Sequence, residues 1–177
     1  MKNWRTAATA IVGVIAAIGT AEAITDTAFI YSTAKTGWYT INPAELTPQT
    51  NLIGYTAGTS SLALTANNGG CFETGVHLPQ SATITQLTVW HQSGAAGNDL
   101  IVGFDRVGLG TGAIDVVAAS SLHDNSNARK QATLTPAAGT TVVNNATFRY
   151  MFFVCPMTTD NLFYGARVSY TYKNAGD

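Results

Sequence analysis

The chain has 177 residues, of which 46% are hydrophobic and 11% are charged, and its formal net charge at pH 7 is −1. There is no surplus of Lys and Arg to neutralise phosphates or anionic lipid headgroups, so nucleic acid and membrane surfaces are poor partner candidates. A chain with this little charge and this many hydrophobic residues is also not intrinsically disordered.

The first 23 residues have the pattern of a secretory signal peptide. Lys2 and Arg5 form a basic start, residues 7–18 are an uncharged apolar run, and residues 21–23 (AEA) are the small-x-small site that signal peptidase cleaves. The run is shorter than the roughly 20 residues of a membrane span. We therefore expect a secreted or periplasmic mature chain that begins at Ile24 and has no membrane segment. This chain keeps 154 residues, with 7 Lys and Arg against 9 Asp and Glu, which suits a single domain.

Beyond residue 24 the sequence repeats one pattern, in which a short run of alternating residues is followed by a cluster of turn-forming residues. This pattern is typical of β-strands joined by turns. The expected strands are residues 37–41, 51–58, 60–66, 71–78, 82–91, 99–107, 113–121, 132–135, 148–155 and 162–172. Because no crossover helix separates them, they predict an all-β, antiparallel sandwich. A jelly roll is the expected topology and an immunoglobulin-like sandwich is the alternative.

Alternation along these strands predicts which side chains face the core. The expected core residues are the even-numbered residues from Phe72 to Leu78, Leu87 and Val89, then Leu100, Val102 and Phe104, then Ile114, Val116 and Ala118, and the even-numbered residues from Leu162 to Tyr172. The run 148–155 differs from the others because it is apolar on both faces.

Cys71 and Cys155 are the two cysteines of the chain. In an oxidising compartment, an even number of cysteines predicts a disulfide. If the even-numbered residues of 148–155 face the core, both cysteines lie on outer faces, and they can pair between neighbouring strands of one sheet. The alternative is two separate buried thiols. A bridge requires the two Cα atoms to lie within about 7 Å of each other.

Three stretches of the sequence resemble a group of small secreted bacterial proteins to which no activity is assigned. They are GVHLPQSATITQLTVW (75–90), FRYMFFV (148–154) and YGARVSYTY (164–172). The pattern of that group resembles V-x-L-P-x-G-A-x-I-T-x-L-T-V followed by Y-G-x-R-V-x-Y, and Ser81 stands here in place of its glycine. The resemblance covers roughly residues 37–172, and it implies a jelly-roll-like β-sandwich without implying an activity.

No catalytic motif is present. His77, His91 and His123 are scattered, and HExxH, GxSxG and paired-carboxylate patterns do not occur. We therefore expect no enzymatic activity, no catalytic residues and no cofactor.

Calcium is the one ion for which the sequence offers candidate ligands, in the polar stretch HDNSN. Asp124, Asn125 and Asn127 are oxygen ligands at alternate positions, and Asp99 or Asp105 could join them. The set lacks a bidentate acidic residue, so a solvated loop whose Asx side chains bond their own backbone is favoured.

The tryptophans are the remaining candidates for a ligand-binding site. Trp90 shares a strand face with Gln86 and Thr88, opposite Leu87 and Val89, and Trp38 and Tyr39 must point to opposite faces. A sugar ring can stack its C–H face on such a ring while neighbouring polar groups bind its hydroxyls. This reasoning makes Trp90, His91, Gln86 and Trp38 the candidate ligand-binding residues.

Two structural alternatives compete with a ligand at Trp90. Residues 24–50 could cover its face as an N-terminal covering segment, or a second subunit could do so in a homo-oligomer. We expect Trp90 to be more than half covered in one of these two ways.

The sequence thus predicts one β-sandwich domain over residues 24–177. The expected function is a non-enzymatic binding or structural module at the cell exterior, of an adhesive, matrix or carbohydrate-recognising kind, with a glycan or cell-surface component as partner. The alternative is a hydrolase or lyase that acts on polysaccharide. A concave face with aromatic residues and two close carboxylates would favour the enzyme, and a flat face poor in carboxylates would favour binding.

Overall fold

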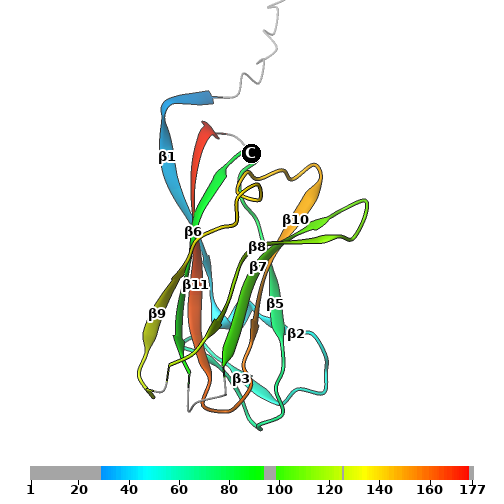
Figure 1. The fold of residues 1–177 in the computed structure, drawn as a ribbon, viewed down its shortest axis with the longest axis vertical. Coiled ribbons are helices and arrows are strands. Elements are labelled where there is room, and N and C mark those ends of the chain that lie inside the picture. The colour runs from blue at the N-terminus through cyan, green and yellow to red at the C-terminus, as the bar shows by residue number, and fades with distance from the viewer. Residues whose placement is uncertain (1–28, 94–98, 125, 176–177) are drawn as a thin grey trace, which may run out of the picture.

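Residues 29–93, 99–124 and 126–175 are described by a computed structural model of the protein. They form two antiparallel sheets, A and B, which appear as two layers in Figure 1. The predicted signal peptide, residues 1–23, lies outside the described residues. Within the described part of the chain, no helix is long and apolar enough to cross a membrane.

The two sheets divide the strands between them. Sheet A has the order β3 (Tyr55–Ala57), β4 (Leu62–Leu64), β11 (Leu162–Ala175), β6 (Thr83–Gln92) and β9 (Lys130–Leu134), and β1 (Phe29–Ile41) also pairs with β11. Sheet B has the order β2 (Thr47–Pro48), β5 (Phe72–Val76), β10 (Phe148–Cys155), β7 (Leu100–Gly108) and β8 (Ile114–Leu122). The short 3-10 helix η1 (Pro43–Glu45) lies between β1 and β2.

The strand order is that of a jelly roll. From β4 to β11, the strands pair as β4-β11-β6-β9 in sheet A and as β5-β10-β7-β8 in sheet B. This arrangement confirms the predicted all-β fold, and it is not the immunoglobulin-like alternative.

The hydrophobic core lies between the inner faces of the two sheets. Its largest fully buried side chains are Phe72, Phe104 and Phe152 from sheet B and Phe163 from sheet A. The rings of Phe152 and Phe163 lie 5.5 Å apart between centroids, so the two layers contact each other through aromatic side chains. The predicted core residues of β5, β6 and β7 are buried, apart from the half-buried Thr74.

The predicted core face of β8 is wrong at its first two positions. Ile114 is 63% exposed and Val116 is 51% exposed, whereas Val117 and Ala118 are buried. The register between β7 and β8 shifts by one residue at a bulge next to Phe104. A one-residue insertion turns the following side chains to the opposite face, so strict alternation fails there.

A second bulge changes the start of β11. The register with β6 shifts between Phe163 and Gly165, and Phe163 is fully buried where Tyr164 was expected in the core. Gly165 has φ of +144°, a backbone conformation that side chains rarely allow. Beyond it, Ala166 and Val168 face the core as predicted.

The described part of the segment expected to cover Trp90 contributes a strand to each sheet. Residues 29–41 form β1, a strand of sheet A itself, in which Trp38 pairs with Ser169 of β11. Residues 47 and 48 form β2 and pair with β5 in sheet B. A strand edge carries unpaired backbone N–H and C=O groups, and β1 satisfies those of β11 by extending the sheet.

Candidate functional site

The outer face of sheet B carries a hollow of about 1050 Å³. Its walls come from β5, β10 and β7, from the turn between β7 and β8, and from the segment around β2. Met151, Phe153 and Val107 give it an apolar floor, and Glu73, Asp105 and Arg149 are among its charged residues. An apolar hollow with a few converging polar groups is the usual form of a ligand site.

The Phe153 ring extends over the neighbouring strand. Phe153 of β10 pairs with Gly103 of β7, and a Cβ atom built on Gly103 would lie 2.2 Å from Cε1 and 2.3 Å from Cζ of Phe153. The ring therefore occupies the space that a side chain at position 103 would fill. Phe153 also lines the hollow, so its ring is accessible to a ligand there.

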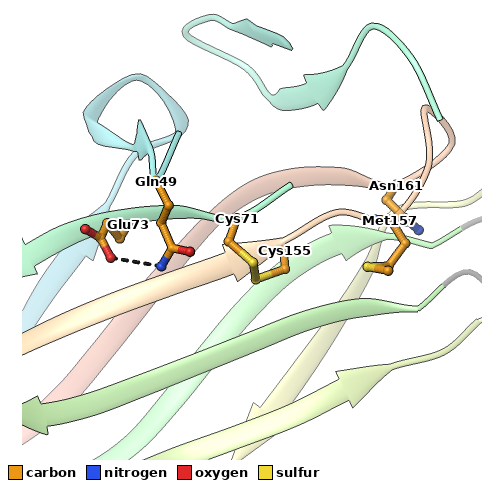
Figure 2. Close-up of a disulfide and its surroundings, with 6 residues drawn as sticks. All are labelled: Gln49, Cys71, Glu73, Cys155, Met157 and Asn161. Atoms are coloured by element: carbon orange, nitrogen blue, oxygen red, sulfur yellow. Dashed lines mark hydrogen bonds between the residues drawn. A yellow bond between two sulfur atoms is a disulfide. The ribbon is translucent and has the colours of Figure 1, made fainter. Parts of the chain in front are cut away.

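Polar groups lie on the other side of Phe153. Its partner on β5 is Glu73, whose Oε2 accepts a hydrogen bond of 3.0 Å from Nε2 of Gln49. Figure 2 shows these two side chains pointing toward each other. The backbone carbonyl of Glu73 also accepts a bond of 3.1 Å from the Thr47 hydroxyl. These contacts hold a carboxylate and an amide beside the ring.

The predicted disulfide is confirmed, and it borders the same hollow. Cys71 precedes β5 and Cys155 ends β10, and their Cα atoms are 4.1 Å apart (Figure 2). The bridge joins neighbouring strands of one sheet, as the alternation along both strands predicted. The chain after β10 is held by Asn161, whose Oδ1 accepts a hydrogen bond of 2.9 Å from the backbone N–H of Met157.

Asp105 is a buried carboxyl group in the hollow. It is 7% exposed, and its Oδ1 has no hydrogen-bond partner among the described residues. Burial raises the pKa of this carboxyl above its ordinary value, because the charged form loses its hydration. A buried carboxyl oxygen without a partner is costly in its charged form, which agrees with the direction of this shift.

The tryptophans that were predicted to bind a ligand lie on the opposite side of the molecule, on the outer face of sheet A. Trp38 is 60% exposed there, and its pairing partner Ser169 pairs in turn with Gln86. Trp90, farther along β6, is mostly covered, and the Arg167 guanidinium lies 5.5 Å from its ring centroid. Trp90, Gln86 and Trp38 therefore share a face, and an arginine of β11 lies over Trp90.

His91 does not belong to that face. It is buried and points to the core side of β6, as strict alternation after Trp90 requires. Burial lowers the pKa of its imidazole, a shift that the charge of Asp124 partly opposes, and its Nδ1 has no partner among the described residues. This position corrects the choice of His91 as a ligand-binding residue.

The residues considered as calcium ligands make separate contacts with their own neighbours. Asp124 accepts a hydrogen bond of 3.1 Å from the backbone N–H of Ser126, which is an Asx turn, and lies 3.6 Å from Nζ of Lys130. Asn125 lies outside the described residues. Among the residues that the structure describes, no group of three or more His, Cys, Asp or Glu could hold a metal ion.

Asp99 forms a separate cluster with Ser121 and His123. Its carboxylate accepts a hydrogen bond from the Ser121 hydroxyl and lies 2.8 Å from Nδ1 of His123. These contacts lower the pKa of the Asp99 carboxyl, with the Ser121 hydrogen bond as the largest cause. A nucleophilic serine needs a histidine next to its hydroxyl, and here the carboxylate lies between them.

Sequence reasoning missed the hollow. Met151 and Phe153 lie in the run 148–155, which is apolar on both faces although one face of a sandwich strand ordinarily meets solvent. That excess of apolar residues was the available signal. The part that Gly103 has in placing Phe153 depends on cross-strand pairing and leaves no local mark in the sequence.

No protein-family model and no curated protein matches the sequence. Among solved structures, the chain is similar to the C-terminal CBM6 of LamC, a marine laminarinase from Zobellia galactanivorans, with 13% identity, a TM-score of 0.48 and coverage of 75% of this chain and 98% of that chain. It is also similar to CBM29_1, a family 29 carbohydrate-binding module from Piromyces equi, with 7% identity, a TM-score of 0.41 and coverage of 77% and 91%. With TM-scores below 0.5, these likenesses identify neither a ligand nor a binding surface for this chain.

Proposed function

We propose that the protein is a secreted, non-enzymatic module that binds a glycan in the hollow on the outer face of sheet B. The observation that carries the proposal is the Phe153 ring, which extends over Gly103 beside the Glu73–Gln49 pair. A sugar ring has apolar C–H faces and a rim of hydroxyl groups. It therefore needs a flat aromatic ring with hydrogen-bonding groups around it, and these residues supply both.

The volume of the hollow supports a ligand larger than a single ion. A volume of about 1050 Å³ is at the upper end of the range of small-molecule sites. Glu73 and Arg149, which line the hollow, carry groups that can accept hydrogen bonds from sugar hydroxyls and donate hydrogen bonds to them.

The test is a glycan array followed by titration calorimetry with the mature protein, residues 24–177. Phe153→Ala should weaken binding of the selected glycan by about fivefold, since stacking on an aromatic ring contributes on the order of 1 kcal/mol. Gly103→Ala should have a similar effect, because its Cβ displaces the ring. The matched control is Gly58→Ala, at an exposed glycine between β3 and β4 that does not line the hollow and has no atom within 4 Å of its added Cβ.

Binding that persists unchanged in Phe153→Ala, or no glycan binding at all, would contradict the proposal. Release of new reducing ends from a bound polysaccharide would favour the hydrolase alternative, since Glu73 and Asp105 both line the hollow. Export is tested on the same preparation, whose intact mass should correspond to a chain that begins at Ile24.

A further inference from the structure

We infer that the outer face of sheet A is a second binding surface, and that it binds an acidic polysaccharide through its carboxylate or sulfate groups. This face lies on the opposite side of the sandwich from the hollow, so the inference does not depend on the proposed function. It rests on the contacts of Arg167, Arg129, Gln86, Gln92 and Trp38.

Arg167 is a half-buried cation without a counter-charge. Its guanidinium lies over Trp90, its Nε is buried without a hydrogen-bond partner, and no carboxylate forms an ion pair with it among the described residues. A guanidinium stays protonated at every physiological pH. A charge that is partly removed from water and unpaired is costly, and an anionic ligand would lower that cost.

Arg129 is an exposed arginine whose guanidinium also lies over an aromatic ring. Its guanidinium lies 4.6 Å from the centroid of the Tyr164 ring, and it directly precedes Lys130, which pairs with His91 of β6. Among the described residues, Arg129 also has no ion pair, whereas Asp124 pairs with Lys130. Two guanidinium groups are thus held over aromatic rings without carboxylates.

The neutral side chains of the face add hydrogen-bond donors. Oε1 of Gln86 accepts a bond of 3.1 Å from the Thr88 hydroxyl, and Oε1 of Gln92 accepts a bond of 3.0 Å from the Tyr164 hydroxyl. Both glutamines therefore use their acceptor oxygen within the protein and leave their NH₂ groups as donors. A surface of guanidinium and amide donors selects acceptor groups, and anionic oxygens are the strongest acceptors.

Trp38 makes the expected ligand a polysaccharide and not a free anion. Its mostly exposed ring lies on the same outer face, two residues before Thr40, which pairs with Arg167. Diagonal neighbours of this kind are about 7–8 Å apart, within reach of long side chains. A sugar ring stacked on Trp38 would thus bring a carboxylate or sulfate substituent to Arg167.

The experiment measures binding of the mature protein to polygalacturonate, dextran sulfate and neutral dextran. Arg167→Gln should weaken binding to the anionic polymers at least tenfold, and Arg167→Lys should restore part of the loss. The matched control is Lys173→Gln, which removes the same charge from an exposed position on β11 and should change affinity less than twofold. Trp38→Ala, at an exposed site that does not threaten folding, should also weaken binding.

Preference for polygalacturonate or for dextran sulfate would identify the carboxylate or the sulfate as the recognised group, and either supports the inference. Equal losses in Arg167→Gln and Lys173→Gln would overturn it, because binding would then reflect net charge alone. Binding that is lost in Phe153→Ala would also overturn it, since the anion would then lie in the hollow. Failure of all three polymers to bind would overturn it too, while leaving neutral glycan binding in the hollow open to its own test.

Discussion

The two outer faces of the sandwich differ in shape and in charge, although both belong to sheets that share one core. The face of sheet B is hollowed, with an apolar floor around Phe153 and the carboxyl groups of Glu73 and Asp105 at its sides. The face of sheet A holds Arg167 over Trp90 and has no carboxylate paired with it among the described residues. Since the inner faces alone form the core, each outer face is free to suit a different ligand.

Covalent support also distinguishes the two faces. The Cys71–Cys155 disulfide joins β5 and β10 at the border of the hollow, and it closes a loop with a sequence separation of 84. Replacing both cysteines by serine should lower the free energy of unfolding by about 4.5 kcal/mol in the chain-entropy model. Urea denaturation of the oxidised protein and of the variant measures this difference.

Reduction of the disulfide should sharpen the contrast, because it loosens the strands that carry Glu73 and Phe153 but not those of sheet A. In conditions where the reduced protein stays folded, neutral glycan binding should fall more than binding of anionic polymers. An unchanged urea midpoint after reduction would show that the bridge adds no stability.

The two tryptophans of sheet A should differ in their effect on stability. Trp90 is mostly covered, so Trp90→Ala should lower the free energy of unfolding by about 2–3 kcal/mol, toward the low end of the range for large core truncations. Trp38 is largely exposed, and Trp38→Ala should cost less than about 0.5 kcal/mol, as is usual for surface positions. Thermal and urea unfolding compare the two variants, with Trp90→Phe as the conservative control. Equal losses would show that the two rings are equally buried in solution.

The smallest expected effect is a pH dependence of the folding stability, which arises from Asp105 in the hollow. Its pKa in the folded protein is raised by burial, so between its ordinary value and the raised value the folded state binds more protons than the unfolded state. Its contribution to stability is therefore present at low pH and is lost as the pH rises through the folded-state pKa.

The variant Asp105→Asn should lack this contribution. At neutral pH it should be as stable as the natural chain or more stable, because no buried charge must form, and the difference should decrease toward pH 3–4. Urea midpoints at several pH values measure both curves, and Asp160→Asn, at an exposed position, is the control. A difference that grows at low pH would contradict the burial argument.

Several features of the fold could be predicted because they depend on local pattern. The run 148–155 has the bounds of β10, and alternation placed Cys71 and Cys155 on outer faces where they could pair. Short strands without crossover helices lead to an antiparallel sandwich, because the apolar face of each strand must be buried against another sheet. Alternation also placed Trp90 outside the core and Leu87 and Val89 inside it.

The rest was decided by contacts between segments that are distant in the sequence. The bulges next to Phe104 and Phe163 interrupt the alternation along β8 and β11, and a bulge depends on the register with a partner strand. The Phe153 ring finds its space because β10 lies beside β7 at Gly103, and Arg167 reaches Trp90 because β11 lies beside β6. The sequence by itself determined the approximate positions of the strands and, where no bulge intervenes, their buried faces, since side-chain alternation is a property of each strand alone. The two candidate sites were decided by the tertiary structure, because strand pairing sets which side chains meet.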